Sequence, residues 1–291
     1  MKMNQLPAFT FAKLDLNFAE PDYEPGKTKE IKITESSVIN FNEASDVKLK
    51  ITAEENKEIS VVVLFTARDT LYLKAELEAK KASKIKLVEI DASLNEGRLI
   101  SDVRGECKED AKIELVQVFP GLGDIYSDCT IELTGDRSFF ESRTSYLSRK
   151  GKKTDLNYVA NHRGKDTLSE IHADGILKDG AEKTCRQTVN FISGAAGSKG
   201  HETEHVLLLG DDIVNKSVPL ILCTEEDVEG THGAALGSLD DEMLFYLESR
   251  GIGREDAEKL IINATFNKLL RYIDDEETKE KTEHLLEEVL V

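Results

Sequence analysis

The chain has 291 residues, and its 56 acidic and 38 basic residues give it a formal charge of −18 and a pI of about 4.9. This negative charge argues against binding to nucleic acid, which requires a basic face that displaces counterions from phosphates. Aromatic residues make up only 6% of the chain and Trp is absent, so platforms that stack against sugars or unpaired bases are scarce.

The first residues do not predict a targeting signal. The opening MKMNQLP lacks an apolar segment, and no later stretch approaches about 18 consecutive uncharged apolar residues. We therefore expect a soluble, cytoplasmic protein that makes no contact with a membrane. Residues 1–30 hold three of the five prolines, which predicts an irregular lead-in.

Residues 31–237 are predicted to form a mainly β body. Short segments there alternate between apolar and polar residues, as in strands with one buried and one exposed face. Because aromatic residues are few, we expect a core of continuous Val, Leu and Ile. The alternating segments are residues 47–51, 59–65, 70–77, 84–90, 112–118 and 130–135.

Weak internal repeats indicate how these strands are arranged. KIKLVEI at Lys84 returns as KIELVQV 28 residues later, and GKKTDLNYV at Gly151 returns as GAEKTCRQTV 29 residues later. Strands without intervening helices cannot form βαβ units, and Asp/Gly turn signals such as Asp174-Gly175 are too few for a series of tight hairpins. This pattern favours a parallel β-solenoid over a sandwich or barrel, and the ends of a solenoid require caps.

Residues 238–291 predict a helical subdomain that supplies one cap. A first helix starts at a capping sequence beginning with Ser238 and ends at Gly251. A second helix is expected over residues 254–273, and a third, acidic helix over residues 276–291. We expect the apolar faces to pack on the body, although an exposed stripe would instead form a groove for a partner helix. The inward residues of the second helix are predicted to be Ala257, Leu260, Ile261, Ala264 and Leu269.

The segment from Ser217 combines a proline, an acidic step that ends in Asp-Val, then His-Gly-Ala and LFYLESRGI. This combination closely resembles the C-terminal signature of the SufB/SufD (SufBD) family, the scaffold proteins of iron–sulfur cluster assembly. LPAFTFAKLDLN from Leu6 and Asn161-His162 resemble the family more loosely. The matching positions of the signature are Pro219, Asp227, Val228, His232, Gly233, Ala234, Gly237, Leu239, Asp240, Leu244 to Leu247 and Ser249 to Ile252.

The resemblance implies a right-handed parallel β-helix flanked by terminal helices, in agreement with the solenoid predicted from the repeats. It also implies a non-enzymatic scaffold that forms a homodimer or pairs with a SufB-like subunit. The helical ends of family members dock an ABC-type ATPase, so a SufC-like ATPase is an expected partner. ATP binding by the chain itself is not expected, because its loop at residues 194–200 lacks the GxxxxGK[ST] spacing.

His232 is the principal candidate for a cofactor-binding and metal-binding residue. A neutral imidazole is a competent iron ligand, and the adjacent Gly233 lets a cluster or a backbone approach closely. In SufD-like members the corresponding histidine is linked to cluster assembly at the subunit interface. The resemblance thus implies an iron–sulfur cluster that binds transiently and is shared between subunits. The alternative is a histidine that is hydrogen-bonded into a turn between solenoid and helices.

Three positions depart from the family pattern. Ile213 stands where SufB-like members carry an acceptor cysteine, Gly230 where many SufD-like members carry a cysteine, and Leu222 where the family has a glutamate. A thiolate is the natural soft ligand and persulfide carrier. The chain therefore resembles SufD more than SufB, or a compact divergent relative, and it lacks the expected primary sulfur acceptor.

The four cysteines lie far apart and form no CxxC pair, so neither a disulfide framework nor a zinc knuckle is predicted. Each is expected to be a buried thiol. Cys223 is also a second candidate for cofactor binding, because it lies nine residues before His232 and would face the same interface if the intervening segment turns back. The other three are Cys107, Cys129 and Cys185.

The segment HETEH has the HExxH spacing of zinc hydrolases, with Glu202 in the position of the base. That motif requires a helix, whereas the VLLLG that follows predicts a strand with His201 and His205 on one side. A zinc-dependent hydrolase is therefore the alternative function. A solenoid that acts on polysaccharide is a further alternative, but its aromatic subsites are not supplied by this composition.

Overall fold

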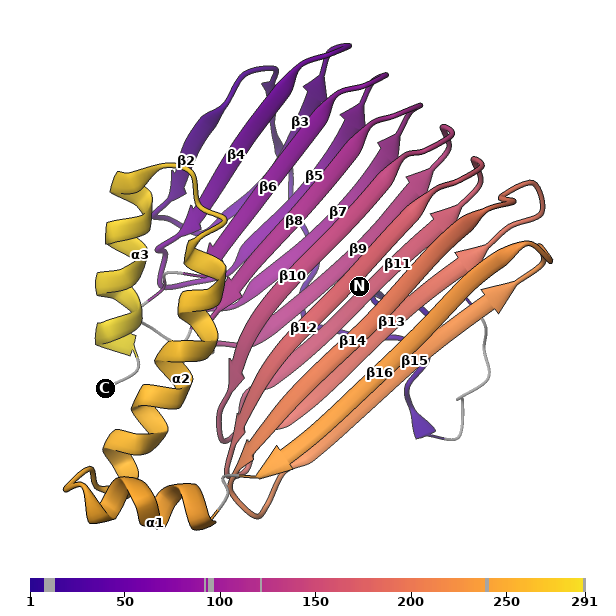
Figure 1. Ribbon diagram of the computed structural model, residues 1–291. Coiled ribbons are helices and arrows are strands. Elements are labelled where there is room, and N and C mark those ends of the chain that lie inside the picture. Colours follow the sequence, from indigo (N-terminus) through magenta and orange to yellow (C-terminus); the bar gives the residue numbers. More distant parts are fainter. Residues whose placement is uncertain (8–13, 92, 94–96, 121, 239–240, 290–291) are drawn as a thin grey trace.

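The computed structural model describes residues 1–7, 14–91, 93, 97–120, 122–238 and 241–289. Two parallel sheets of eight strands each lie face to face, and consecutive strands alternate between them (Figure 1). The predicted parallel β-solenoid is confirmed.

The odd-numbered sheet contains β1 (Lys29–Ile33), β3 (Ser45–Ala53), β5 (Leu71–Ala79), β7 (Leu99–Cys107), β9 (Ile125–Leu133), β11 (Lys153–His162), β13 (Glu182–Phe191) and β15 (Val214–Cys223). The even-numbered sheet contains β2 (Ser37–Phe41), β4 (Glu58–Phe65), β6 (Lys84–Asp91), β8 (Lys112–Phe119), β10 (Phe139–Ser148), β12 (Leu168–Lys178), β14 (Ser198–Leu209) and β16 (Val228–Ser238).

The internal repeats of the sequence are successive coils of the solenoid. Lys84 of β6 pairs with Lys112 of β8, so KIKLVEI and KIELVQV lie side by side in register. Gly151 and Gly180 occupy equivalent turns, where the backbone N–H of Gly151 donates to the carbonyl of Gly180 at 3.2 Å. Both glycines have a positive φ, +69° and +68°, which explains why the turn retains glycine in both coils.

One predicted turn is wrong. Asp174-Gly175 lies inside β12, where Gly175 pairs with Tyr146 of β10. A Cβ added at Gly175 would lie 2.2 Å from the Tyr146 ring, which is fully buried. This glycine is therefore required by the size of its neighbour and not by a chain reversal.

The interior is aliphatic in most coils, but it also contains a buried polar network in the middle of the solenoid. The Glu89 carboxylate accepts hydrogen bonds from Ser101 at 2.9 Å and from the Gln117 amide at 2.7 Å. The Tyr158 hydroxyl donates to the Gln117 side-chain carbonyl at 2.6 Å. The expectation of a continuous aliphatic core is wrong here, because buried polar groups are tolerated where they satisfy one another's hydrogen bonds.

The lead-in packs on the outer face of the odd-numbered sheet. Met3 and Ala19 form an antiparallel bridge with N–O distances of 3.0 and 2.8 Å. The Asn4 side-chain amide donates to the carbonyl of Asp155 at 2.9 Å, and Arg186 donates through Nε to the carbonyl of Leu16 at 2.6 Å. The described part of this segment is thus irregular, as predicted, and it is held by charged residues of the sheet.

Three helices follow the last strand: α1 (Asp241–Ser249), α2 (Arg254–Leu270) and α3 (Glu276–Val289). The segment α2–α3 lies along the outer face of the even-numbered sheet (Figure 1). Gly251 has a φ of +84° and ends α1, as predicted. Of the capping sequence predicted before α1, Ser238 ends β16 and residues 239–240 lie outside the described residues. No helix in the described ranges is long and apolar enough to cross a membrane.

The buried face of α2 differs from the predicted one. Ala257 and Leu269 are buried as expected, but Leu260 and Ala264 are exposed. Their places against the sheet are taken by Ile262, Phe266 and Leu270. Apolar residues lie on several sides of this helix, so its sequence does not identify the face that meets the sheet.

We predict that Gly175→Ala lowers the free energy of unfolding by roughly 2 kcal/mol, because the added methyl group overlaps the Tyr146 ring in a closed core. Urea unfolding followed by circular dichroism measures the change. Gly237→Ala is the control, since a Cβ at that β16 position meets no atom within 4 Å, and its effect should stay within about 0.5 kcal/mol. Equal unfolding midpoints for the two variants would contradict the overlap.

Candidate functional site

The last coil, formed by β15 and β16, is the open end of the solenoid. β15 pairs with β13, and β16 pairs with β14; each is the final strand of its sheet in the described chain. Residues of β16 are exposed along almost the whole strand. Side chains that would face the core in an inner coil therefore face solvent here, and we call this surface the mouth.

His232 lies in the mouth. In β16 it pairs with Glu202 of β14, and paired residues of parallel strands project to the same side. Glu202 is turned into the solenoid and buried, so the His232 imidazole projects in the same inward direction one coil further on. It is exposed because no coil covers it. A Cβ at Gly233 would have a single neighbour, at 4.0 Å, so the backbone beside His232 is also accessible.

Cys223 lies in the mouth too, and the expectation that it is buried is wrong. It ends β15, pairs with the inward-facing Phe191, and is exposed. Its thiol donates to the carbonyl of Glu225 at 2.8 Å. The reason for the exposure is position, since an inward-facing side chain at the end of the last strand has no following coil to cover it.

Cys223 and His232 are not adjacent. A Cβ at Gly230 would lie 3.1 Å from Ile221, so these two residues face each other across the mouth. Cys223 is two residues beyond Ile221 in one direction, and His232 is two residues beyond Gly230 in the other. At about 3.3 Å per residue they are roughly 13 Å apart along the strands. They share one surface but cannot bind the same metal ion.

The other three cysteines are buried, as expected. Burial raises the pKa of each thiol well above its ordinary value, so all three remain protonated near neutral pH. They are Cys107, Cys129 and Cys185.

The positions that depart from the family pattern lie next to the mouth. A Cβ at Gly230 would already meet Phe191 at 3.0 Å and Ile221 at 3.1 Å, so a cysteine there would require these side chains to move. Ile213 precedes β15 and packs against the core. Of the acidic step, the Glu225 carboxylate accepts the backbone N–H of Gly194 at 2.8 Å, and such backbone hydrogen bonds lower its pKa. This carboxylate stabilises a turn.

A buried charged cluster lies one coil below the mouth and was not identified in the sequence. Lys183 of β13 donates to Glu204 of β14 across the solenoid interior and to the Ser217 hydroxyl of the last coil at 3.0 Å. The Tyr146 hydroxyl donates to the same Glu204 carboxylate at 2.9 Å. This cluster ties the two sheets together beneath the mouth. The alternation of the strand KTCRQTV could have predicted it, because Lys183 and Cys185 are two residues apart and therefore point to the same, inward side.

Glu202 has a different environment. It is 1% exposed, and neither carboxylate oxygen forms a hydrogen bond of standard geometry with the described residues. Burial raises its pKa to about 8, an effect that the nearby backbone amides of Val189 and Leu220 only partly oppose. A protonated, uncharged Glu202 therefore lies directly below the His232 position near neutral pH.

The HETEH segment lies in β14, as the strand prediction required. His201 and His205 project from the outer face, where His201 contacts the Thr231 hydroxyl at 2.7 Å and His205 contacts Asp174 at 3.2 Å. Glu202 projects inward, away from both. Within the described ranges, no group of three or more His, Cys, Asp or Glu side chains is placed to hold a metal ion. The segment lacks the geometry of a zinc hydrolase.

We predict that Glu202→Gln stabilises the isolated chain at alkaline pH. The folded-state pKa of about 8 exceeds the ordinary value of 4.5, so folding retains a proton that the unfolded chain releases. The contribution of Glu202 to the stability of the wild type should fall as the pH rises from 4.5 to 8, so the advantage of the variant over the wild type should grow to about 4 kcal/mol.

Urea unfolding between pH 4.5 and 8.5 measures this difference. Glu229→Gln on the exposed side of β16 is the control, and its curve should remain parallel to that of the wild type. A constant difference between Glu202→Gln and wild type across this range would contradict the assignment.

Comparison with known families agrees with this architecture. Residues 37–265 match the family model described as SUF system FeS cluster assembly, SufBD core domain. The iron–sulfur cluster assembly protein SufD of Bacillus subtilis is 31% identical over 153 residues, which are 53% of this chain and 35% of that protein. SufD of Escherichia coli is 28% identical over 151 residues, covering 52% of this chain and 36% of that protein. SufB of Bacillus subtilis is 26% identical over 189 residues, covering 64% and 40%. The matched part thus spans little more than a third of the length of these curated relatives. Because the family model covers most of the chain, including both strands of the mouth, the chain belongs to the SufBD family.

Proposed function

We propose that the chain is a non-enzymatic scaffold subunit of iron–sulfur cluster assembly that presents His232 to a nascent cluster at its mouth. The observation that carries the proposal is the exposed imidazole on an inward-facing position of an uncovered coil. The cluster is cargo, and this chain alone supplies too few ligands for it. A second subunit must contribute the remaining ligands, including the sulfur acceptor absent at Ile213 and Gly230.

The proposed dimer forms through β16. This strand offers its free backbone edge to a partner, carries Leu236 as an exposed apolar residue, and has Glu229 as its only charged residue. An unguarded edge of this kind favours pairing with another strand. A second copy, or a SufB-like subunit, would extend the even-numbered sheet and place its own ligands opposite His232.

The proposed site for a SufC-like ABC ATPase is the surface formed by α1 and the start of α2. Phe245 and Tyr246 of α1 and Leu260 of α2 are large apolar residues exposed to solvent. Exposed aromatic side chains are typical anchors of protein interfaces. Apolar exposure at α1 and α2, together with the family relationship, supports docking of the ATPase here.

His232→Ala should reduce the amount of cluster assembled on the complex roughly tenfold, because an imidazole ligand is lost while the fold is retained. Anaerobic reconstitution with a SufB-like subunit and its ATPase, followed by iron and sulfide analysis, measures the yield. His201→Ala removes an imidazole from the outer face of β14 and should leave the yield unchanged. Equal yields from wild type and His232→Ala would refute the role of His232.

Phe245→Asp should weaken ATPase binding by about tenfold or more, because it replaces the most exposed apolar side chain of the proposed surface with a charge. A pull-down titrated with the cognate ATPase measures the affinity. Leu14→Asp is a matched control on the lead-in, since Leu14 is 61% exposed and Phe245 is 73% exposed. If both variants bind as the wild type does, the ATPase docks elsewhere; if cluster yield with His232→Ala also stays unchanged, the scaffold proposal fails.

A further inference from the structure

The four edge strands of the solenoid differ in how they are protected against pairing. β1 carries Lys29, Glu30 and Lys32, and β15 carries Lys216 and Pro219. Charged residues and proline on an edge strand discourage the addition of another strand. β16 has one charged residue, and it is the edge through which we propose that subunits pair. The remaining edge, β2, has the sequence SVINF and contains no charged residue or proline.

β2 is held from one side and open on the other. It pairs with β4 from Ser37 to Phe41, and no other strand of the described chain pairs with it. Ile39 and Phe41 pack against the solenoid core, which anchors the strand. Val38 projects to the outer face and is 48% exposed. The backbone groups along the free edge of β2 are therefore available in a strand that is already ordered.

The outer face beside β2 is hollowed on both sides of Val38. One hollow of about 690 Å³ lies between β2, β4, β6 and the residues that precede α3, and a second of about 570 Å³ lies between β2, β4 and α3. Both are lined by Val38 and Asp275, so they adjoin along the strand. Together they form a groove over the outer face of β2 and its neighbour β4, bounded by α3, which is seen alongside β2 in Figure 1.

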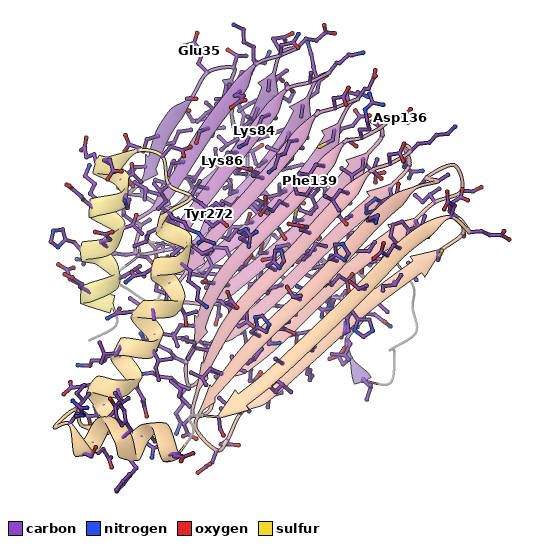
Figure 2. The ribbon with its side chains drawn as sticks, viewed as in Figure 1. Glu35, Lys84, Lys86, Asp136, Phe139 and Tyr272 are labelled. Atoms are coloured by element: carbon purple, nitrogen blue, oxygen red, sulfur yellow. The ribbon has the colours of Figure 1, made fainter. Side chains whose placement is uncertain are left out.

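The wall formed by α3 is fixed in place. Lys86 of β6, labelled in Figure 2 near Tyr272, donates to Asp274 at 2.7 Å and ties the start of α3 to the sheet. Asp275 accepts the backbone N–H of Thr278 at 2.8 Å and caps the helix. Leu286 is buried against the sheet. The groove is thus preorganised, which lowers the entropic cost of binding.

The charge of the groove is negative. Its lining contains five acidic residues and three lysines, and two of the acids are paired with lysines of the lining, Asp274 with Lys86 and Glu277 with Lys281. Complementary charge therefore favours a basic occupant over an acidic one. The acidic residues of the lining are Glu58, Asp274, Asp275, Glu277 and Glu288.

We propose that the free edge of β2 and the groove beside α3 bind an extended peptide segment in which apolar and basic residues alternate. The segment adds to the even-numbered sheet as a strand, its backbone pairs with β2, and its apolar side chains enter the groove around Val38. Its basic side chains meet the acidic rim. This site lies at the opposite end of the solenoid from His232 and is independent of the cluster proposal.

The test uses a fluorescent heptapeptide of alternating lysine and valine, titrated into the whole chain and followed by anisotropy. A peptide of the same sequence that is N-methylated at alternate residues keeps the charge and side chains but loses the backbone donors on one edge. We expect it to bind at least tenfold more weakly. A glutamate–valine peptide should bind at least tenfold more weakly as well. Equal affinity for either control peptide would overturn the proposal.

Val38→Lys should weaken binding of the lysine–valine peptide about tenfold. Val214→Lys is the matched control, since Val214 is 43% exposed at the opposite end of the solenoid, and its affinity should equal that of the wild type. Amide hydrogen exchange of residues 37–41 should slow when the peptide binds. Unchanged affinity in Val38→Lys, or no protection in β2, would overturn the assignment. A dimer that dissociates on Val38→Lys and excludes the peptide would instead assign this edge to a second copy.

Discussion

The in-register stacking of parallel strands is the constraint on which the rest of this structure depends. Each strand pairs residue for residue with the strand of the next coil, so a side chain that faces the core in one coil directs its partner to the same side. A shift by one residue would exchange the inner and outer faces of every following strand. Glu202 and His232 are paired in this register, so both side chains project to the same, inward side. His232 is nevertheless exposed to solvent, because no strand follows β16.

Stacking also leaves the solvent-accessible backbone groups and inward-facing side chains at the two ends of the solenoid. Inner coils satisfy both of their edges, whereas the first and last coils leave backbone groups and inward-facing side chains uncovered. At one end this produces the mouth with His232 and Cys223, and at the other it produces the free edge of β2. Charge is distributed unequally over these edges: β1 and β15 carry lysines, while β2 carries none. The two unguarded edges belong to the same sheet, the one along which α2 and α3 lie.

The polar groups inside the solenoid show how such a stack keeps two sheets together without a purely aliphatic core. Lys183 and Glu204 meet across the interior, and the Tyr146 hydroxyl donates to the same carboxylate oxygen. Breaking a buried pair of this kind leaves an uncompensated charge, so the three residues act as one unit. Glu202, only two residues from Glu204, lacks such partners, and burial holds it in its neutral form. Neighbouring glutamates in one strand thus differ in their partners, because Glu204 faces Lys183 and Tyr146 whereas Glu202 faces no such group.

Local features could be predicted from the sequence, because they depend on near neighbours. Alternation located the strands, the repeats at Lys84 and Gly151 predicted stacked coils, and Gly251 marked a helix end. The signature around His232 also identified the family before any geometry was known. Which residues are buried depends instead on the packing of distant segments. Cys223 is exposed because its strand is the last of its sheet, and Leu260 is exposed because α2 meets the sheet with another face. Position 175 requires glycine because the Tyr146 ring of the neighbouring strand fills the adjacent space. Burial depends on which segments pack together across the fold, and the pattern within one segment does not record that partner.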